Sequence, residues 1–203
     1  MTRKRIASLL SVLSVAALVA AAGCNGDGLF GSNSGRLRVV LSNGGTTAAP
    51  ALNGSEDEHG DGSHLSAWFE SAKVTLSSVL ARNLDGQLIN VDLTLPITVD
   101  VVQIEGGKQV VLPDGTLPTG SYDQVVLVIT AVEGTTKDGT LVTIEPPGGG
   151  WTAVVPICQL DVAAGSTETV DITLNARNSF LQSGSHWGFQ PRFQSHLNCA
   201  STP

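Results

Sequence analysis

Residues 117–132, with the sequence LPTGSYDQVVLVITAV, decide the fold class of this chain. Pro118 restricts φ and Gly120 permits a positive φ, so both favour a turn just before Tyr122. From Tyr122 onward the residues are rich in β-branched side chains, which favours a strand over residues 122–132. A turn that leads directly into such a run is typical of β proteins.

Similar strand signals recur at short intervals on both sides of this stretch. They cover residues 36–42, 87–93, 98–104, 141–144, 151–155, 169–174 and 186–193. Turn sequences separate several of them, namely Asp85-Gly86, Asp114-Gly115, Asp138-Gly139 and Gly148-Gly149-Gly150. This pattern predicts an all-β fold, an antiparallel β-sandwich. Residues 65–80 fit both helical and strand spacing, so periodicity leaves that segment open.

The N-terminus has the pattern of an export signal that ends at a cysteine. Residues 3–5 are basic, residues 6–20 are almost wholly apolar, and the small residues 20–23 precede Cys24. The apolar run is short for a permanent membrane span and fits a signal helix, so residues 1–23 are the predicted signal peptide. The end resembles the lipobox of bacterial lipoproteins, in which the cysteine sulfur carries a lipid. Simple secretion with a free Cys24 thiol, or an uncleaved anchor, are the alternatives.

Cysteine parity agrees with lipidation of Cys24. The chain has two further cysteines, Cys158 and Cys199, an even pair in an exported and oxidising setting. We predict a disulfide between them, which closes a loop of about 40 residues and stabilises by roughly 4 kcal/mol in the chain-entropy model. Two buried reduced thiols are the alternative. The residue after Cys24 is Asn25 and not the Asp of the Gram-negative retention rule, which resembles the pattern of lipoproteins sent to the outer membrane. We therefore expect a membrane-anchored lipoprotein in the outer membrane or on the cell surface.

Composition divides the exported part into a tether and one domain. Residues 24–35 are rich in Gly, Ser and Asn and predict a flexible tether. Residues 36–199 are the predicted domain, with a long polar loop at residues 43–64, and residues 200–203 form a tail. The formal net charge of −7 argues against nucleic-acid partners. The same negative charge disfavours direct contact with anionic lipid, so the expected membrane contact is the lipid on Cys24. We expect a monomer.

The polar loop holds the candidate metal ligands Asp57, His59, Asp61 and His64. The spacing from Asp57 has some likeness to a calcium loop, but His59 takes a position that needs an oxygen ligand. For zinc, the two histidines with one of the aspartates are suitable donors. A solvated surface loop is the favoured interpretation. No cofactor is predicted, and calcium is the alternative.

The three tryptophans are candidates for a ligand platform. Trp68, Trp151 and Trp187 have ring faces of the kind that stack on sugars in glycan-binding sandwiches. Packing in the core is the favoured interpretation for each, because a chain with 4% aromatic residues needs its large rings inside. Trp187, followed by Trp151, is the preferred platform residue if one exists.

Three pieces of sequence resemble a known family. They are residues 99–102 (VDVV), residues 117–128 (LPTGSYDQVVLV), and residues 162–180, which contain VAAGST, VDI and SF. Together they resemble the bacterial lipoprotein domain known as domain-of-unknown-function family 4382, over roughly residues 36–197. The resemblance implies a prealbumin/Ig-like β-sandwich, no established activity, and strand within residues 65–80, especially residues 72–80.

Motifs for catalysis do not emerge from the sequence. It contains no metalloprotease, phosphate-loop or nucleophile-elbow motif. Asp100 and Asp171 lie in expected strands, where they either pair for acid–base chemistry or face solvent and cap turns. We predict a lipid-anchored, non-catalytic cell-envelope β-sandwich that displays loops to an envelope glycan or protein. A glycan-binding module, a calcium-dependent adhesion domain and an envelope hydrolase are the rival functions.

Overall fold

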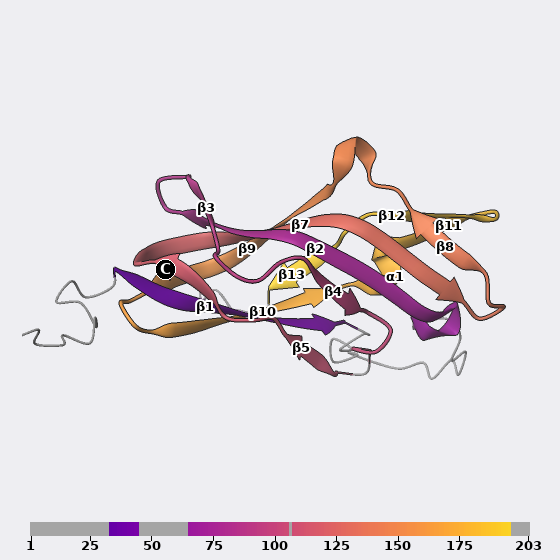
Figure 1. Ribbon diagram of the computed structural model, residues 1–203, viewed down its shortest axis with the longest axis horizontal. Coiled ribbons are helices and arrows are strands. Elements are labelled where there is room, and N and C mark those ends of the chain that lie inside the picture. The colour runs from indigo at the N-terminus through magenta and orange to yellow at the C-terminus, as the bar shows by residue number, and fades with distance from the viewer. Residues whose placement is uncertain (1–32, 45–64, 106, 196–203) are drawn as a thin grey trace, which may run out of the picture.

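The computed structural model describes residues 33–44, 65–105 and 107–195, and strands make up most of them (Figure 1). The predicted all-β class is therefore confirmed. The helical elements in these ranges are short: the 3₁₀ turns η1 (Leu65–Ala67) and η2 (Pro147–Gly149), and the single turn α1 (Ala176–Ser179). No helix in the described ranges combines the length and apolar character that crossing a membrane requires. The expected signal helix over residues 1–23 lies outside them.

The larger sheet is built on two long strands, β2 (Phe69–Asn83) and β7 (Gly120–Thr136), which pair antiparallel along their length. The other strands of this sheet are β3 (Leu88–Asn90) and β4 (Ile97–Asp100) beside β2, and β8 (Leu141–Ile144) and β9 (Trp151–Val162) beside β7. Every one of these pairs is antiparallel, as predicted. Residues 69–80, within the segment where helical and strand spacing competed, are strand, because alternate side chains such as Val74 and Leu76 enter the core.

The second sheet has the order β13–β10–β1–β5, with β6 also paired to β1. Its strands are β1 (Ser34–Asn43), β5 (Gln109–Val111), β6 (Gly115–Pro118), β10 (Thr167–Leu174) and β13 (Phe193–Ser195). β1 and β10 run parallel, which corrects the expectation of antiparallel strands throughout. Apolar alternation indicates which side chains face the core but not the strand direction. No hairpin joins β1 to β10, so no turn sequence revealed the direction either.

A short hairpin of β11 (Phe180–Ser183) and β12 (His186–Phe189) forms the third sheet. The strand expected over residues 186–193 is divided into β12 and β13, because Pro191 between them lacks the N–H that a ladder needs. β5, β6 and β11 were not predicted, since three or four residues are too few for a clear period-two pattern. β1 begins at Ser34, so the last two residues of the expected tether belong to the domain.

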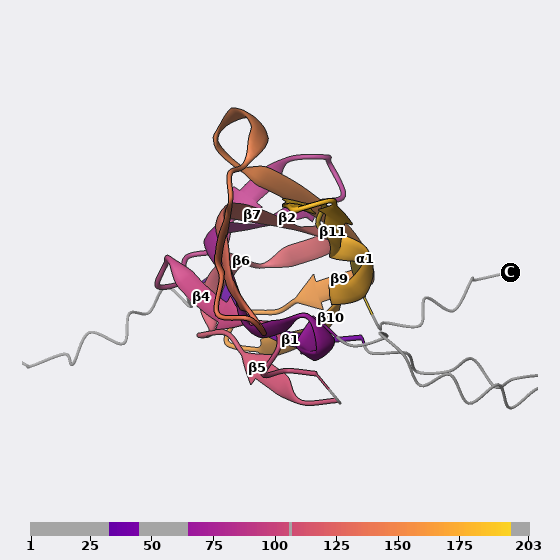
Figure 2. The same cartoon turned by 90° about the vertical axis from the view of Figure 1, so that its right-hand side faces the viewer.

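The core lies between the two large sheets, which face each other in the end view (Figure 2). From the second sheet Leu37, Val39 and Leu41 of β1 point inward, and from the larger sheet Val125 and Leu127 of β7 do the same. Each of these side chains is at most 5% exposed, and burying an aliphatic side chain of this size stabilises by about 1.5–3 kcal/mol. This packing holds β2 and β7 as a rigid support from one end of the molecule to the other.

Candidate functional site

Six aromatic side chains form one continuous row at the end of the molecule where β7 finishes. In order of contact they are Trp68, Trp187, Phe69, Phe180, Phe189 and Trp151. The last four are buried, at 8% exposed or less, whereas Trp68 and Trp187 are only partly buried. The row therefore runs from two indole rings at the surface, Trp68 and Trp187, to Trp151 in the core.

The two surface tryptophans come from separate segments. Trp68 lies between η1 and β2, and Trp187 lies on β12 opposite Gln182 of β11. Their ring centroids are 6.0 Å apart with a 51° angle between the planes. The ring of Phe69 supports Trp187 edge-on at 4.6 Å, and Phe69 is fully buried. The position of the Trp187 ring is thus set by the core behind it.

A groove of about 470 Å³ opens beside the two rings. Two further apolar residues, Ala67 and Val142, contribute to its lining. The remaining lining residues are polar and come from the β7–β8 turn and the β11–β12 hairpin: Thr136, Lys137, Asp138, Thr140, Gln182 and Ser185. The groove thus joins flat aromatic surface to hydroxyl, amide, ammonium and carboxylate groups.

Hydrogen bonds hold the β7–β8 turn in one conformation. The carboxylate of Asp138 accepts from the Thr136 hydroxyl and, at 3.2 Å, from the Thr140 N–H. These donors, chiefly the Thr136 hydroxyl, hold the pKa of Asp138 below its usual value. The backbone N–H of Lys137 donates to the Trp68 carbonyl at 2.9 Å, which ties the turn to the tryptophan segment. Two walls of the groove are therefore joined directly.

The structure gives different environments to the tryptophans that the sequence suggested as a ligand platform. Trp151 is 8% exposed and packs edge-on against Phe189 at 5.2 Å, so it is a core residue at the inner end of the aromatic row. Trp187 lines the groove together with Trp68. Sequence reasoning named Trp187 but missed its neighbours Gln182 and Ser185, because the β11–β12 hairpin was not predicted. The signal for this hairpin in the sequence was Gly184, a residue that favours turns, and in the structure its φ of 61° places it in the turn between β11 and β12.

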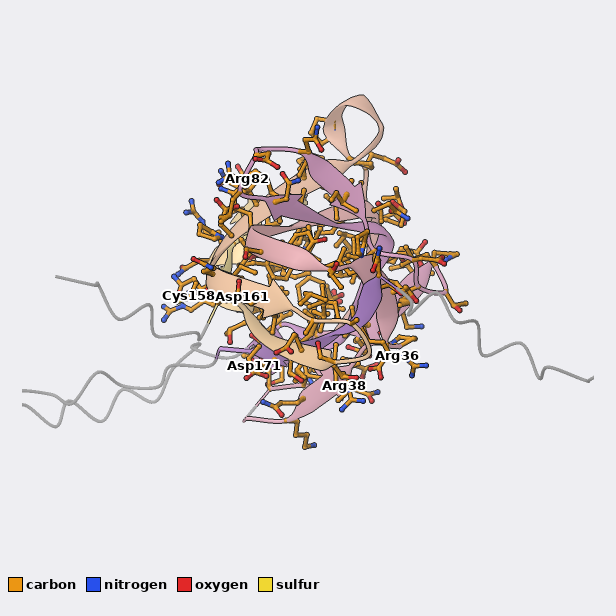
Figure 3. The ribbon with its side chains drawn as sticks, turned by 90° about the vertical axis from the view of Figure 1, so that its left-hand side faces the viewer. Arg36, Arg38, Arg82, Cys158, Asp161 and Asp171 are labelled. Atoms are coloured by element: carbon orange, nitrogen blue, oxygen red, sulfur yellow. The ribbon has the colours of Figure 1, made fainter. Side chains whose placement is uncertain are left out.

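Asp100 and Asp171 lie in different sheets. Asp100 ends β4, and its Oδ1 accepts hydrogen bonds of 3.1 Å from the N–H groups of Ala72 and Val102. It therefore caps the turn after β4. Asp171 lies on β10 opposite Val40, in the other sheet, and Figure 3 shows it along the same sheet as Arg38.

Several residues named from the sequence lie outside the described residues. They are Cys24, Asp57, His59, Asp61, His64 and Cys199. Lipidation, metal binding and the disulfide therefore stay predictions. Among the described residues no group of three or more His, Cys, Asp or Glu side chains is arranged to hold a metal ion. Cys158 lies on β9 and is partly buried (Figure 3).

The described N-terminal residues enter the domain at the end opposite the groove. The Asn33 carbonyl accepts from the Thr119 N–H, and the Ser34 carbonyl accepts from the Gly165 N–H, both at 2.9 Å. Thr119 immediately precedes β7, whereas the groove lies where β7 ends. A strand of this length spans roughly 50 Å. Figure 1 shows the same separation, with the start of β1 at one end and β8, β11 and β12 at the other.

Comparison with known families gives one match. Residues 64–191 match the model of the family described as Domain of unknown function (DUF4382). The match covers more than half of the chain and includes β2 to β12 with the whole groove. Comparisons with curated proteins and with solved structures found no match.

Proposed function

Because the chain belongs to the DUF4382 family, whose description names no activity, we propose its function from its own residues: a lipid-anchored, non-catalytic β-sandwich of the cell envelope that holds a binding groove away from the membrane. The lipid on Cys24 localises the protein. Residues 25–33 act as the tether, and the β2–β7 ladder acts as a spacer. The partner is an envelope glycan or protein.

One observation carries the proposal, namely the separation of the tether entry from the groove. Asn33 is hydrogen-bonded beside the start of β7, and Trp68 and Trp187 lie beside its end. A membrane anchor on the N-terminal side therefore leaves the groove about 50 Å from the lipid surface when the long axis is upright. The prealbumin/Ig-like class expected for the domain suits this arrangement, because such sandwiches present loops at the two ends of a rigid core.

The non-catalytic part of the proposal is supported by how the carboxylates are used. The Asp138 carboxylate, in the groove wall, accepts hydrogen bonds from its own turn and has a lowered pKa. Asp100 caps a turn through two backbone N–H groups. Both carboxylates are thus engaged in holding turns of the fold, which supports structural roles for them.

The test of anchoring is metabolic labelling of the full chain with an alkyne-bearing fatty acid in a bacterial host. We expect label on the wild-type protein, which sediments with membranes, and none on Cys24→Ala. Cys158→Ala is the matched control, because it removes a cysteine and should keep the label. Recovery of unlabelled wild-type protein from the medium would overturn the proposal.

The test of orientation uses fluorescence energy transfer from the anchored protein to an acceptor lipid in vesicles. A dye is placed through an unnatural amino acid at Ala164, near the tether entry, or at Thr140, on the groove turn; both positions are exposed. We expect stronger transfer from Ala164, since the two positions lie at opposite ends of β7. Equal transfer from both would contradict the display geometry.

A further inference from the structure

We propose that the groove between Trp68, Trp187 and the β7–β8 turn binds a neutral carbohydrate. The indole rings stack on the face of a sugar ring, and the surrounding polar side chains bind its hydroxyl groups. The proposal rests on the display function for its setting, whereas its binding chemistry stands on the groove alone.

The aromatic part of the groove suits a ring-shaped ligand. A pyranose presents an apolar face of C–H groups, and an indole is a flat apolar surface of matching kind with a partial negative charge that attracts those hydrogens. Trp68 and Trp187 are tilted by 51° and so form two adjoining faces rather than one closed stack.

The polar part of the groove selects among ligand classes. It offers the hydroxyl of Thr140 and the amide of Gln182, which both donate and accept as sugar hydroxyls do. The Thr136 hydroxyl donates its proton to Asp138, so towards a ligand it acts as an acceptor. An acyl chain would desolvate these groups without giving them partners, which costs free energy for each. Lys137 and Asp138 contribute one charge of each sign, and the chain carries a net charge of −7, so a polyanion is disfavoured.

The groove is held in place before any ligand arrives. Phe69 fixes Trp187 from the core side at 4.6 Å, and the Lys137 N–H joins the β7–β8 turn to Trp68. Gln182 and Trp187 face each other across the β11–β12 ladder. A preformed site loses little conformational entropy on binding. This matters for a sugar ligand, because each contact with it is weak and cannot offset a large entropy cost.

The experiment is titration of the full chain with neutral oligosaccharides, followed by tryptophan fluorescence and calorimetry. The panel is cellohexaose, chitohexaose, xylohexaose and mannohexaose, with polygalacturonate as an anionic contrast. The protein is held in a detergent without a sugar headgroup. We expect at least one neutral oligosaccharide to bind and polygalacturonate not to bind.

Variants locate the site. Trp68→Ala and Trp187→Ala should each weaken binding about tenfold or more, which corresponds to about 1.4 kcal/mol for one lost ring contact. Lys137→Ala and Gln182→Ala change exposed side chains outside the core, so they test the groove even if a tryptophan variant unfolds. Trp151→Phe is the matched control, because Trp151 lies at the buried end of the aromatic row, and it should bind as the wild type does.

Three outcomes would overturn the inference: no binding across the neutral panel, stronger binding of the polyanion, or unchanged binding in all four groove variants. Cys24→Ala separates this inference from the anchoring proposal. It should bind the oligosaccharide as the wild type does, since the anchor is remote from the groove. A failed fatty-acid label therefore removes only the anchoring proposal, and a failed titration removes only the carbohydrate site.

Discussion

The hydroxyl of Tyr122 donates a hydrogen bond of 2.8 Å to the backbone carbonyl of Pro118, across the turn that begins β7. Tyr122 is 1% exposed, and Gly120 between the two residues has a φ of 151°, which a residue with a Cβ rarely adopts. The side chain thus closes the turn that precedes it and anchors the strand on which the sheet is built.

Replacement of Tyr122 by Phe should lower the free energy of unfolding by about 1–2 kcal/mol, because the Pro118 carbonyl loses its donor. Burial raises the pKa of Tyr122, so the folded chain holds this proton more tightly than the unfolded chain does. The resulting stability is complete below the unfolded pKa near 10 and is lost as the pH rises through the folded pKa. Denaturant unfolding at neutral and alkaline pH tests both effects. A wild type that is no more alkali-sensitive than Tyr122→Phe would contradict the pKa argument.

This turn is also where local sequence predicted the structure well. Pro118, Gly120 and the β-branched run after Tyr122 act within a few residues of one another, so the turn and the strand follow from the sequence alone. The turns at Asp85-Gly86 and Asp138-Gly139 were predicted for the same reason, and both glycines have φ above 80°. Asp114-Gly115 is different, because Gly115 begins β6 and the Asp114 carboxylate binds Arg38.

Arg82 and Asp123 form a two-point ion pair between β2 and β7, with Nε to Oδ1 at 2.9 Å and Nη2 to Oδ2 at 2.6 Å (Figure 3 labels Arg82). The Arg82 guanidinium lowers the pKa of Asp123. The stability from this pair is therefore present above the unfolded pKa of an aspartate and is lost as the pH falls through the lower folded pKa.

A double-mutant cycle of Arg82→Gln and Asp123→Asn measures that contribution. Both side chains are about one-third exposed and so are screened by water, and we therefore expect a small favourable coupling at neutral pH. The coupling should shrink in acid and in high salt. Each single variant serves as the control for the double variant. A coupling that grows as the pH falls would contradict the assignment.

Gly134 of β7 makes room for the aromatic row. A Cβ at this position would lie 2.8 Å from two ring atoms of Phe69, the residue that supports Trp187. Gly134→Ala should therefore cost about 1–3 kcal/mol of unfolding free energy and shift the tryptophan emission, since the fully buried Phe69 ring would have to move. Gly188→Ala is the matched control, because its Cβ would meet nothing closer than 3.8 Å. Equal stability of the two variants would contradict this account.

The groove could not be predicted because its parts come together only in the tertiary structure. Trp68 precedes β2, Gln182 and Trp187 lie on a hairpin near the other end of the chain, and Thr140 lies on a turn between them in sequence. Composition alone assigned all three tryptophans the same preference for packing. What separates Trp151 from Trp187 is the position of each ring along the aromatic row, and contacts between distant segments set that position. The parallel direction of β1 and β10 was missed for a related reason, since no local turn determines it.

The end of β13 is held beside β9, which supports the predicted disulfide between Cys158 and Cys199. The Ser195 hydroxyl donates a hydrogen bond of 2.6 Å to the carbonyl of Pro156, two residues before Cys158 on the same strand. Cys199 follows Ser195 by four residues, and a chain of that length reaches at most about 14 Å, which suffices to bring the two Cα atoms to the roughly 6 Å of a disulfide.

Mass spectrometry of the non-reduced full chain should therefore find a peptide that links Cys158 and Cys199. Replacement of both cysteines by Ser should lower the free energy of unfolding by roughly 4 kcal/mol, as expected for a closed loop of about 40 residues. Cys24→Ser is the control, because it should leave the linked peptide and the stability of the domain unchanged. A linked peptide that contains Cys24, or quantitative thiol labelling of Cys158 and Cys199 in protein isolated without reductant, would show that this pairing is wrong.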